Sequence, residues 1–302
     1  MKILVTGGAG FIGSNLVEEL VRRGEDVTVV DNFSTGSKEN LKAVLDKVKI
    51  IRAPSTRILD LKLPKVKKIF HLGIPSSSPM YRENPLLVGE AINGFINVLE
   101  LAKQSHSKVV YASTSSLYRG TPIPNREDVV AEPFDYYTEA RIAMERLAKV
   151  YYALQGVSSV GMRFFSVYGP HERNKRQYAN NISQFLWAMR EDKPPEIYGD
   201  GEQTRDFVNV KDVIRACIMA SDSSLGCEAI NIGTGKETSF NRVVELLNKA
   251  LKKSIKPKYG PNPIKNYVDR THADLTKAKK LLGYEPSISL EEGIEQLVKL
   301  NE

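Results

Sequence analysis

The 302-residue sequence has little of the residue types on which disulfide-rich and metal-binding proteins depend. It contains two cysteines, Cys217 and Cys227, which cannot form a disulfide framework and are expected to be buried or inert thiols. Its four histidines share no short motif, and neither cysteine stands in a metal-ligand spacing. We therefore expect no structural disulfide and no metal site.

Long apolar segments are also missing. No apolar run approaches the roughly 18 residues that suggest a membrane-spanning helix, and the N-terminal one is too short for a signal peptide. These features predict a cytoplasmic, soluble protein with no membrane partner. Glycine and proline are near their average frequencies and 41% of the residues are hydrophobic, which favours a full core over disorder.

The formal net charge of +7 would permit nucleic-acid binding, but its distribution argues against it. The basic residues are scattered along predicted helices and are not interleaved with aromatic residues, as in Lys42, Lys47, Lys103, Lys149, Lys249 and Lys252. We interpret them as a solvated surface that helps to steer anionic substrates, and we expect no nucleic-acid partner.

The N-terminus carries the pattern of a dinucleotide-binding βαβ unit. An apolar strand leads into Gly7, Gly10 and Gly13, a helix begins at the last of these, and a second apolar strand ends at Asp31. The glycines permit a tight turn, close approach of a diphosphate and close helix packing, while Asp31 can accept from ribose hydroxyls. The alternative is a turn whose glycines serve packing alone. Because no arginine directly follows Asp31, NAD is favoured over NADP.

Short apolar strands alternate with helical segments along the first half of the chain, which predicts an α/β fold with a Rossmann-type, doubly wound parallel sheet. The later strands are expected at 48–51, 68–72, 108–112, 160–165 and 229–232. Helices are expected near 86–104, 138–155, 181–191, 210–222, 239–252, 274–282 and 290–299.

Beyond Phe165 the regular alternation fails, and loops rich in proline, glycine and charge occupy 166–180, 193–208 and 254–273. These loops are suitable material for a smaller, C-terminal substrate-binding lobe. We expect the NAD-binding domain to comprise 1–165 plus about 206–233. The lobe would comprise about 166–205 and 234–302.

Two further motifs carry candidate chemistry. A hydroxyl-rich segment, residues 113–118, follows a predicted strand, at the sheet edge where catalytic donors belong. About 20 residues later, Tyr137 and Arg141 stand four residues apart at the start of a predicted helix, and therefore on one helical face.

Together with the glycine motif, these segments resemble the extended short-chain dehydrogenase/reductase superfamily, and within it the NAD-dependent nucleotide-sugar 4-epimerases of the UDP-glucose type. The resemblance runs along the whole chain, including the segments 31–36, 163–170, 198–207, 231–235 and 282–286. It implies a Rossmann fold, bound NAD, a UDP-sugar substrate and a homodimer that packs its 86–104 and 138–155 helices into a four-helix bundle.

The resemblance also implies a mechanism. Tyr137, as a phenolate, would take the proton of the sugar 4-hydroxyl while hydride passes to NAD, and Thr114 would hydrogen-bond the same oxygen. UDP-glucose and UDP-galactose, or their N-acetyl forms, would interconvert through a 4-keto sugar. Two alternatives stay open: another sugar-nucleotide oxidoreductase or decarboxylase of the superfamily, and a non-catalytic, NAD-binding redox sensor.

By the same resemblance, the catalytic residues are Tyr137, Thr114 and Arg141. The cofactor-binding residues are Gly7, Gly10, Phe11, Ile12, Gly13, Asp31, Asn32, Ser34, Thr35, Gly36, Ser37, Leu72, Gly73, Ile74, Ser76, Asn93, Ala112, Ser113, Tyr137, Arg141 and Phe164. The substrate-binding residues are Ser78, Thr114, Ser166, Asn181, Ile182, Tyr198, Arg205 and Tyr267. For Arg205 the alternative is a structural pair with Asp206, and His71 is interpreted as a structural histidine.

The chain departs from the family pattern at several positions. Arg141 replaces the usual lysine, so the same charge is delivered with a different geometry. Ser115 and Ser116 stand where the dehydratases carry an acid–base pair, which disfavours dehydration. Ser166 replaces a usual asparagine, and residues 261–267 replace the usual clamp on the nucleotide.

Overall fold

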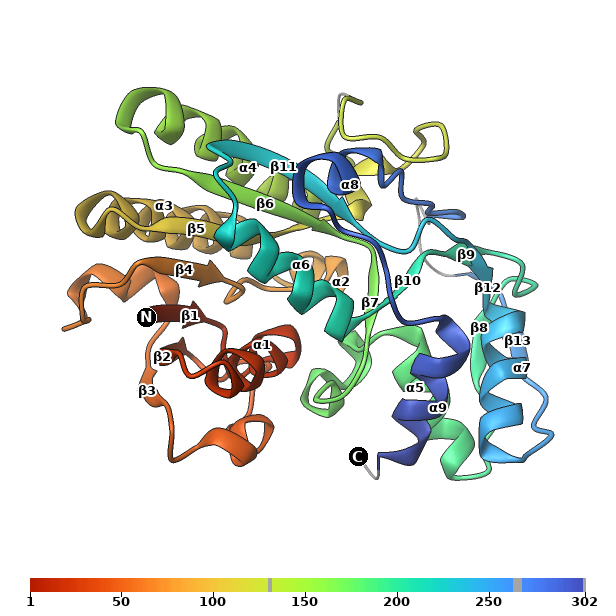
Figure 1. The fold of residues 1–302 in the computed structure, drawn as a ribbon. Helices are drawn as coiled ribbons and strands as arrows, with labels where there is room; N and C mark the ends of the chain where they lie inside the picture. Colours follow the sequence, from red (N-terminus) through yellow and green to blue (C-terminus); the bar gives the residue numbers. More distant parts are fainter. Residues whose placement is uncertain (130–131, 263–267, 301–302) are drawn as a thin grey trace.

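The computed structural model describes residues 1–129, 132–262 and 268–300, and is built on a parallel β-sheet (Figure 1). Within these residues, the central sheet has seven parallel strands in the order β11-β6-β5-β4-β1-β2-β3. The strands are β1 (Lys2–Thr6), β2 (Asp26–Asp31), β3 (Lys49–Arg52), β4 (Lys68–His71), β5 (Lys108–Thr114), β6 (Ser159–Phe164) and β11 (Cys227–Ile232). The predicted fold class is confirmed.

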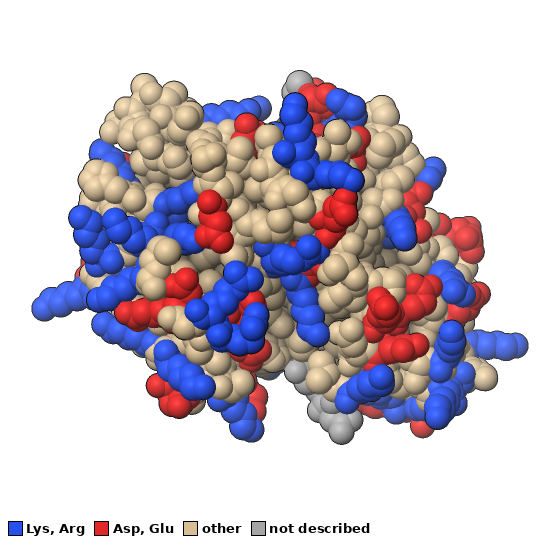
Figure 2. Space-filling view, viewed as in Figure 1, with Lys and Arg blue, Asp and Glu red and all other residues tan. Residues whose placement is uncertain are grey.

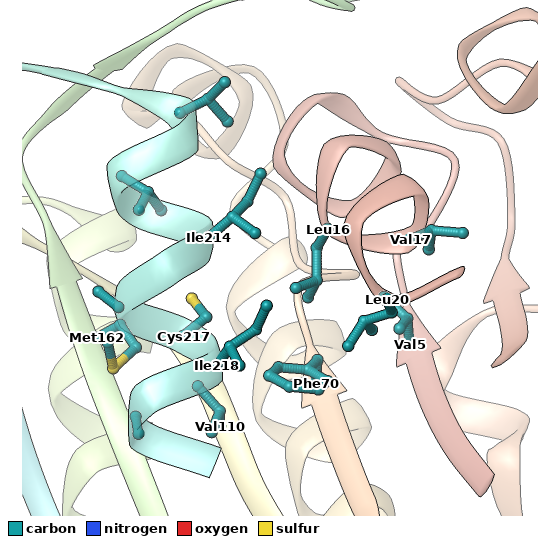
Figure 3. Packing of buried hydrophobic residues seen from close by; sticks show 14 of the residues in the cluster. Val5, Leu16, Val17, Leu20, Phe70, Val110, Met162, Ile214, Cys217 and Ile218 are labelled. Carbon is teal, nitrogen blue, oxygen red and sulfur yellow. The ribbon is translucent and has the colours of Figure 1, made fainter. Parts of the chain in front are cut away.

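Helices cover both faces of this sheet because successive strand residues point to opposite sides. Ile3 and Val5 pack in one core cluster with α1 (Phe11–Arg22) and α6 (Val210–Asp222). Leu4, between them, packs in a second cluster with α3 (Leu87–Ser105) and α4 (Tyr136–Gln155). In Figure 3, α1 and α6 lie side by side over the sheet, with Leu16, Ile218 and Phe70 converging between them.

The strand order creates a ligand crevice at one place. From β1 the chain moves outward to β2 and β3, then returns to β4 on the other side of β1 and continues in the opposite direction. Ligands of such sheets bind beyond the carboxyl ends of the strands at this switch point. The last residues of β1 and β4 meet there, since Thr6 Oγ1 lies 2.8 Å from Nδ1 of His71.

A third core cluster lies beside the sheet (Figure 1, lower right) and contains residues between 168 and 298. Its helices are α5 (Asn181–Arg190), α7 (Phe240–Leu251) and α9 (Leu290–Lys299). Its short strands and those next to it are β7 (Ser166–Tyr168), β8 (Glu196–Tyr198), β9 (Thr204–Arg205), β10 (Phe207–Asn209), β12 (Thr238–Ser239) and β13 (Lys258–Gly260). This cluster corresponds to the expected C-terminal lobe.

One helix lies outside the division expected from the sequence. Ala278 of α8 (Thr276–Leu282), together with Tyr284, packs in the core cluster of α1 and α6, although residues 234–302 were assigned to the lobe. Figure 1 shows α8 near β11, and the two elements are in contact. The exact domain limits stay a prediction.

The remaining elements are short and were not predicted, because segments of this length show no hydrophobic period. They are α2 (Ser78–Glu83) and the 3₁₀ helices η1 (Lys38–Val44), η2 (Ser55–Asp60), η3 (Ser115–Tyr118) and η4 (Arg173–Tyr178). All of them except η1 supply residues to the wall of the ligand cavity described below.

The surface is consistent with the interpretation of the charge distribution. On the face drawn in Figure 2, lysine and arginine are interspersed with aspartate and glutamate. Within the described ranges, no helix is long and apolar enough to span a membrane. The same residues hold no cluster of histidine, cysteine or acidic side chains suited to a metal ion.

A buried ion pair ties α4 to the sheet. Glu145 of α4 accepts hydrogen bonds from Nε and Nη2 of Arg163 on β6, at 2.9 and 2.7 Å, and both side chains are largely buried. Ser113 donates to the same carboxylate at 2.6 Å, and Arg163 also donates to the Tyr118 hydroxyl at 2.7 Å. The pair therefore holds the helix that carries Tyr137 against the end of β5.

We expect Arg163→Met to lower the free energy of unfolding by about 3–5 kcal/mol, because it leaves the Glu145 carboxylate buried and unpaired. The double variant Arg163→Met/Glu145→Leu should be less destabilised than Arg163→Met alone, since it removes both charges. Chemical denaturation measures both. A double variant whose loss equals the sum of the two single losses would contradict this account.

Candidate active site

A cavity of about 610 Å³ lies at the carboxyl ends of the central strands and extends toward the C-terminal lobe. Its walls come from the segments after β1, β2, β4 and β5, from the start of α4, and from residues 164–180. Arg205 and Thr271 line it from the lobe side. It is thus formed between the two parts of the fold, at the switch point of the sheet.

At the glycine motif, main-chain segments pack so closely that there is no room for a side chain on Gly7 or Gly13. Gly7 has a φ of +67°, and a Cβ on it would stand 2.4 Å from the backbone nitrogen of Gly73. A Cβ on Gly13 would stand 2.0 Å from the carbonyl oxygen of Gly7. Gly10 caps α1 without any side-chain hydrogen bond, which leaves N–H groups of the first turn facing the cavity. This cradle fits the diphosphate of a dinucleotide.

Asp31 is fixed at the end of β2 before any ligand binds. Its Oδ2 accepts from the backbone N–H of Ala9 at 2.9 Å, and its Oδ1 accepts from that of Phe33 at 2.7 Å. Burial raises the pKa of this carboxyl, and the two backbone hydrogen bonds oppose the rise. Each oxygen keeps a further lone pair, so the carboxylate can accept from ribose hydroxyls, as the sequence predicts.

Thr114 and Tyr137 meet in the same cavity from different elements. Thr114 ends β5, and its hydroxyl oxygen accepts from the N–H of Ser116 at 3.1 Å, which leaves the hydroxyl proton free for a ligand. Tyr137 lies in the first turn of α4, whose start is fixed by a capping box between Asp135 and Thr138. Only 8% of Tyr137 is exposed.

Arg141 lies one helical turn beyond Tyr137, and only 2% of it is exposed. Its guanidinium carbon is 4.9 Å from the centroid of the Tyr137 ring, and its Nη2 donates to the carbonyl oxygen of Pro75 at 2.7 Å. The predicted neighbourhood of cation and phenol is therefore present, with the guanidinium placed over the ring.

Most predicted cofactor-binding residues line the cavity. They are Gly7, Gly10, Phe11, Ile12, Gly13, Asp31, Asn32, Ser34, Thr35, Gly36, Leu72, Gly73, Ile74, Ser76, Ala112, Ser113, Tyr137, Arg141 and Phe164. The cavity lining does not include Ser37 or Asn93. The Ser37 hydroxyl instead caps η1 by accepting from Glu39, and Asn93 is an exposed residue of α3.

The predicted substrate residues divide in the same way. Ser78, Thr114, Ser166 and Arg205 line the cavity. Asn181 and Ile182 do not, because the helix turns them away: Ile182 is buried in the third core cluster, and the cavity residue is their neighbour Asn180. Tyr198 is an exposed residue at the end of β8 and is also outside the lining. Tyr267 lies outside the described residues.

The hydrogen bonds to the carboxylate of Asp206 come from residues other than Arg205. It accepts hydrogen bonds from Thr234, Gly235 and Ala273 and is fully buried. Arg205 donates to the carbonyl oxygens of Thr204 and Asp269 at 2.7 and 3.2 Å. Arg205 also lines the cavity, and its ligand-binding role stays a prediction.

His71 has the surroundings of a structural histidine. Its side chain is buried, its Nδ1 is bonded to Thr6, and its ring stacks on Phe95 with the centroids 5.7 Å apart. Burial, with a smaller contribution from the Arg141 charge, lowers its pKa to about 3, so the imidazole is neutral at physiological pH.

Several lining residues were missed by the sequence analysis, notably Lys175 and Tyr178 of η4. The ammonium of Lys175 lies 5.3 Å from the ring centroid of Phe11, and Glu172 holds it at 2.9 Å. Tyr178 donates to Glu83 of α2 at 2.6 Å. The charged segment 166–180 indicated a lobe near the crevice, but it gave no signal for which of its side chains faces inward.

Comparison with known proteins agrees with this geometry. Residues 3–233 match the model of the NAD dependent epimerase/dehydratase family. The chain belongs to this family. The site is thus that of an NAD-dependent protein, as predicted, and the glycine cradle and Asp31 are the residues that fit the cofactor.

Three relatives illustrate the range of the similarity. The chain is 37% identical to a UDP-glucuronate 4-epimerase of Thermodesulfobacterium geofontis, covering 98% of this chain and 94% of the relative. It is 33% identical to UDP-glucuronic acid decarboxylase 1 of Arabidopsis thaliana, covering 99% and 69%. The crystal structure of a UDP-glucose 4-epimerase of Thermotoga maritima with UDP-glucose is similar with a TM-score of 0.92, at 33% identity, covering 99% and 98%.

Gly13→Ala should abolish retention of NAD through purification, because its methyl group cannot fit 2.0 Å from a backbone oxygen. Gly89→Ala is the matched control: it lies in α3 with no atom near the added methyl group, and the change should be neutral or stabilise by up to about 1 kcal/mol. The bound NAD is measured by its absorbance after release. Normal NAD content in Gly13→Ala would contradict the assigned cradle.

Proposed function

We propose that this protein is an NAD-dependent nucleotide-sugar 4-epimerase that interconverts UDP-glucose and UDP-galactose through a 4-keto sugar. The observation that carries the proposal is the convergence of Tyr137, Thr114 and Arg141 at the end of the cavity that also holds the glycine cradle and Asp31. An acid–base hydroxyl, a hydrogen-bond donor and a fixed cation are the groups that reversible alcohol oxidation needs.

Tyr137, as a phenolate, takes the proton of the sugar 4-hydroxyl and later returns it. Thr114 donates its hydroxyl proton to the same sugar oxygen and holds it in place. Arg141 places a positive charge against the Tyr137 ring, with its guanidinium carbon 4.9 Å from the ring centroid. When bound, NAD supplies the hydride acceptor and donor.

The substrate diphosphate is expected near Arg205, and a second cation of the lining, Lys175, lies beside Phe11. A guanidinium can bind two phosphate oxygens at once, and an ammonium adds a point charge. Ser78 and Ser166 supply hydroxyls for the sugar. The hydroxyl of Ser78 is already directed at the carboxylate of Asp135, so it can accept from a sugar hydroxyl.

Other activities of the family are less well supported by the residues present. Ser115 and Ser116 line the cavity beside Thr114, and neither can act as the acid or base that a dehydration needs. A uronate is the second candidate substrate, because these serines and Ser166 can hydrogen-bond a carboxylate, and because the relatives include a UDP-glucuronate 4-epimerase.

The reaction is tested by incubating the purified protein with UDP-galactose, and separately with UDP-glucuronate, without added cofactor. Appearance of the 4-epimer supports the proposal and identifies the preferred sugar. Net accumulation of reduced cofactor without an epimer indicates an oxidoreductase, and release of carbon dioxide indicates a decarboxylase. An inert protein that retains NAD indicates a sensor.

Tyr137→Phe should lower kcat of epimerisation by about 10²- to 10⁴-fold, because the phenol that moves the proton is lost. Bound NAD should be retained, since the glycine cradle is unchanged. Steady-state kinetics and NAD content are measured on the same preparation. A kcat within a factor of about three of the unaltered protein would remove Tyr137 from the proton transfer.

We also propose that the protein is a homodimer that buries the outer faces of α3 and α4. Val150 and Leu154 stand one turn apart on α4 and are 49% and 72% exposed, and Leu86, which precedes α3, is 82% exposed. In Figure 2, an uncharged surface lies over the C-terminal end of α4. Exposed apolar side chains near the end of α4 and before the start of α3, on two neighbouring helices, are typical of an interface.

The double variant Val150→Glu/Leu154→Glu should be a monomer by light scattering, because two buried carboxylates on each side would oppose association. Leu45→Glu, which alters an exposed leucine at the end of η1, is the matched control and should stay dimeric. If the double variant is still a dimer at the same concentration, the interface lies elsewhere.

A further inference from the structure

Arg141 is a buried cation that contacts a carbonyl oxygen, a thioether sulfur and an aromatic ring. Its Nη2 donates to the Pro75 carbonyl oxygen and its Nη1 lies 3.6 Å from the sulfur of Met144, while Nε has no hydrogen-bond partner. Within the described part of the chain, no salt bridge reaches it. A buried charge without a counter-charge is costly, so a nearby group that can become negative is favoured in that state.

Tyr81 of α2 and Arg141 donate hydrogen bonds to the same acceptor, the carbonyl oxygen of Pro75. The Tyr81 hydroxyl donates to this oxygen at 3.3 Å, and the Tyr81 side chain is fully buried. Its ring packs against that of Tyr137, with the centroids 5.5 Å apart and the planes tilted by 60°. The Pro75 carbonyl oxygen therefore links Tyr81 and Arg141, and both of these side chains pack against the Tyr137 ring.

The two tyrosines are not equivalent in this arrangement. Burial raises the pKa of Tyr81 to about 12, although the nearby Arg141 charge opposes the rise. Tyr81 thus stays protonated and acts as a hydrogen-bond donor. Tyr137 lines the cavity, where a ligand hydroxyl can reach it.

Among the residues that the structure describes, the other ionisable groups around the pair form no salt bridge with Arg141. His71 is buried and uncharged at physiological pH. Glu90 and Asp135 line the cavity, and the Asp135 carboxylate is engaged with Thr138 and Ser78. Glu145, further along α4, is paired with Arg163.

We propose that Tyr81 is a positioning residue of the active site: together with Arg141 it clasps the Pro75 carbonyl oxygen and so keeps the guanidinium against the Tyr137 ring. This proposal rests on the proposed function of Tyr137 as the acid–base group. Without the Tyr81 hydroxyl, the Pro75 segment and the guanidinium lose a shared anchor, and Tyr137 ionises less readily.

The clasp also explains why arginine and lysine should not be interchangeable at position 141. An ammonium has no planar face to lie on an aromatic ring, and it carries its charge at a single point. In a site where the Pro75 carbonyl is already held by Tyr81, the lysine side chain of Arg141→Lys would place its charge differently. We therefore expect this variant to keep the charge but lose the fixed geometry, and so to fall between the unaltered protein and Arg141→Ala.

The test is an ultraviolet titration of the purified NAD-containing protein, which follows tyrosinate formation and needs no sugar substrate. One tyrosinate should form at lower pH than the rest, and Tyr137→Phe should lack that step. In Tyr81→Phe the step should move to higher pH by roughly 0.5–1 unit, and kcat at neutral pH should fall about 3- to 10-fold with little change in KM.

Two variants control this experiment. Tyr168→Phe removes a buried tyrosine hydroxyl from the C-terminal lobe and should leave the early step and kcat unchanged. In the Arg141→Ala background, Tyr81→Phe should cause no further shift, because its effect acts through the guanidinium.

Three results would overturn the clasp: no early tyrosinate in the unaltered protein, an early step that Tyr81→Phe leaves in place, or a shift in Tyr81→Phe that persists without Arg141. A protein that shows the expected titration but epimerises no sugar would refute the proposed function and leave the clasp standing.

Discussion

The close packing of the main chain around Gly7, Gly13 and Gly73, at the switch point of the sheet, determines where the ligand cavity forms. Gly7 and Gly13 bring the turn after β1, the start of α1 and the segment at Gly73 closer together than any side chain would allow. Because β1 and β4 are neighbours, this contact occurs where the chain reverses direction across the sheet. The helix N-terminus and the carboxyl ends of the strands therefore face the same space, and the catalytic side chains arrive there from β5 and α4.

The fold was predictable because the central strands are buried on both faces. Segments such as Val109–Val110 and Ile3–Val5 are continuous apolar runs, which locate a parallel strand to within one or two residues. The long helices show clear periods and caps. The lobe was harder: its strands are two or three residues long and are formed by contacts distant in sequence, so the chain carries no local signal for them.

The candidate site divides in a similar way. Residues at the end of a central strand, such as Asp31 and Thr114, were correctly predicted to line the cavity, because the strand end fixes where they point. Residues assigned only by their place in a motif were less secure. Asn181 was expected where Asn180 stands, since the start of α5 decides which side chain faces inward, and Asn93 is on the outer side of α3. Nothing in the sequence connects Tyr81 with Arg141, because their common partner is a main-chain oxygen.

The walls of the cavity are held together in two different ways. One wall, formed by η4 and α2, is joined by the hydrogen bond from Tyr178 to Glu83. This bond joins η4 to α2 at the surface, where water competes for both partners. The wall at Gly7, Gly13 and Gly73 is instead formed by main chain packed directly on main chain. The cavity is therefore bounded by a side-chain hydrogen bond between η4 and α2 and, at the glycine cradle, by close-packed main chain.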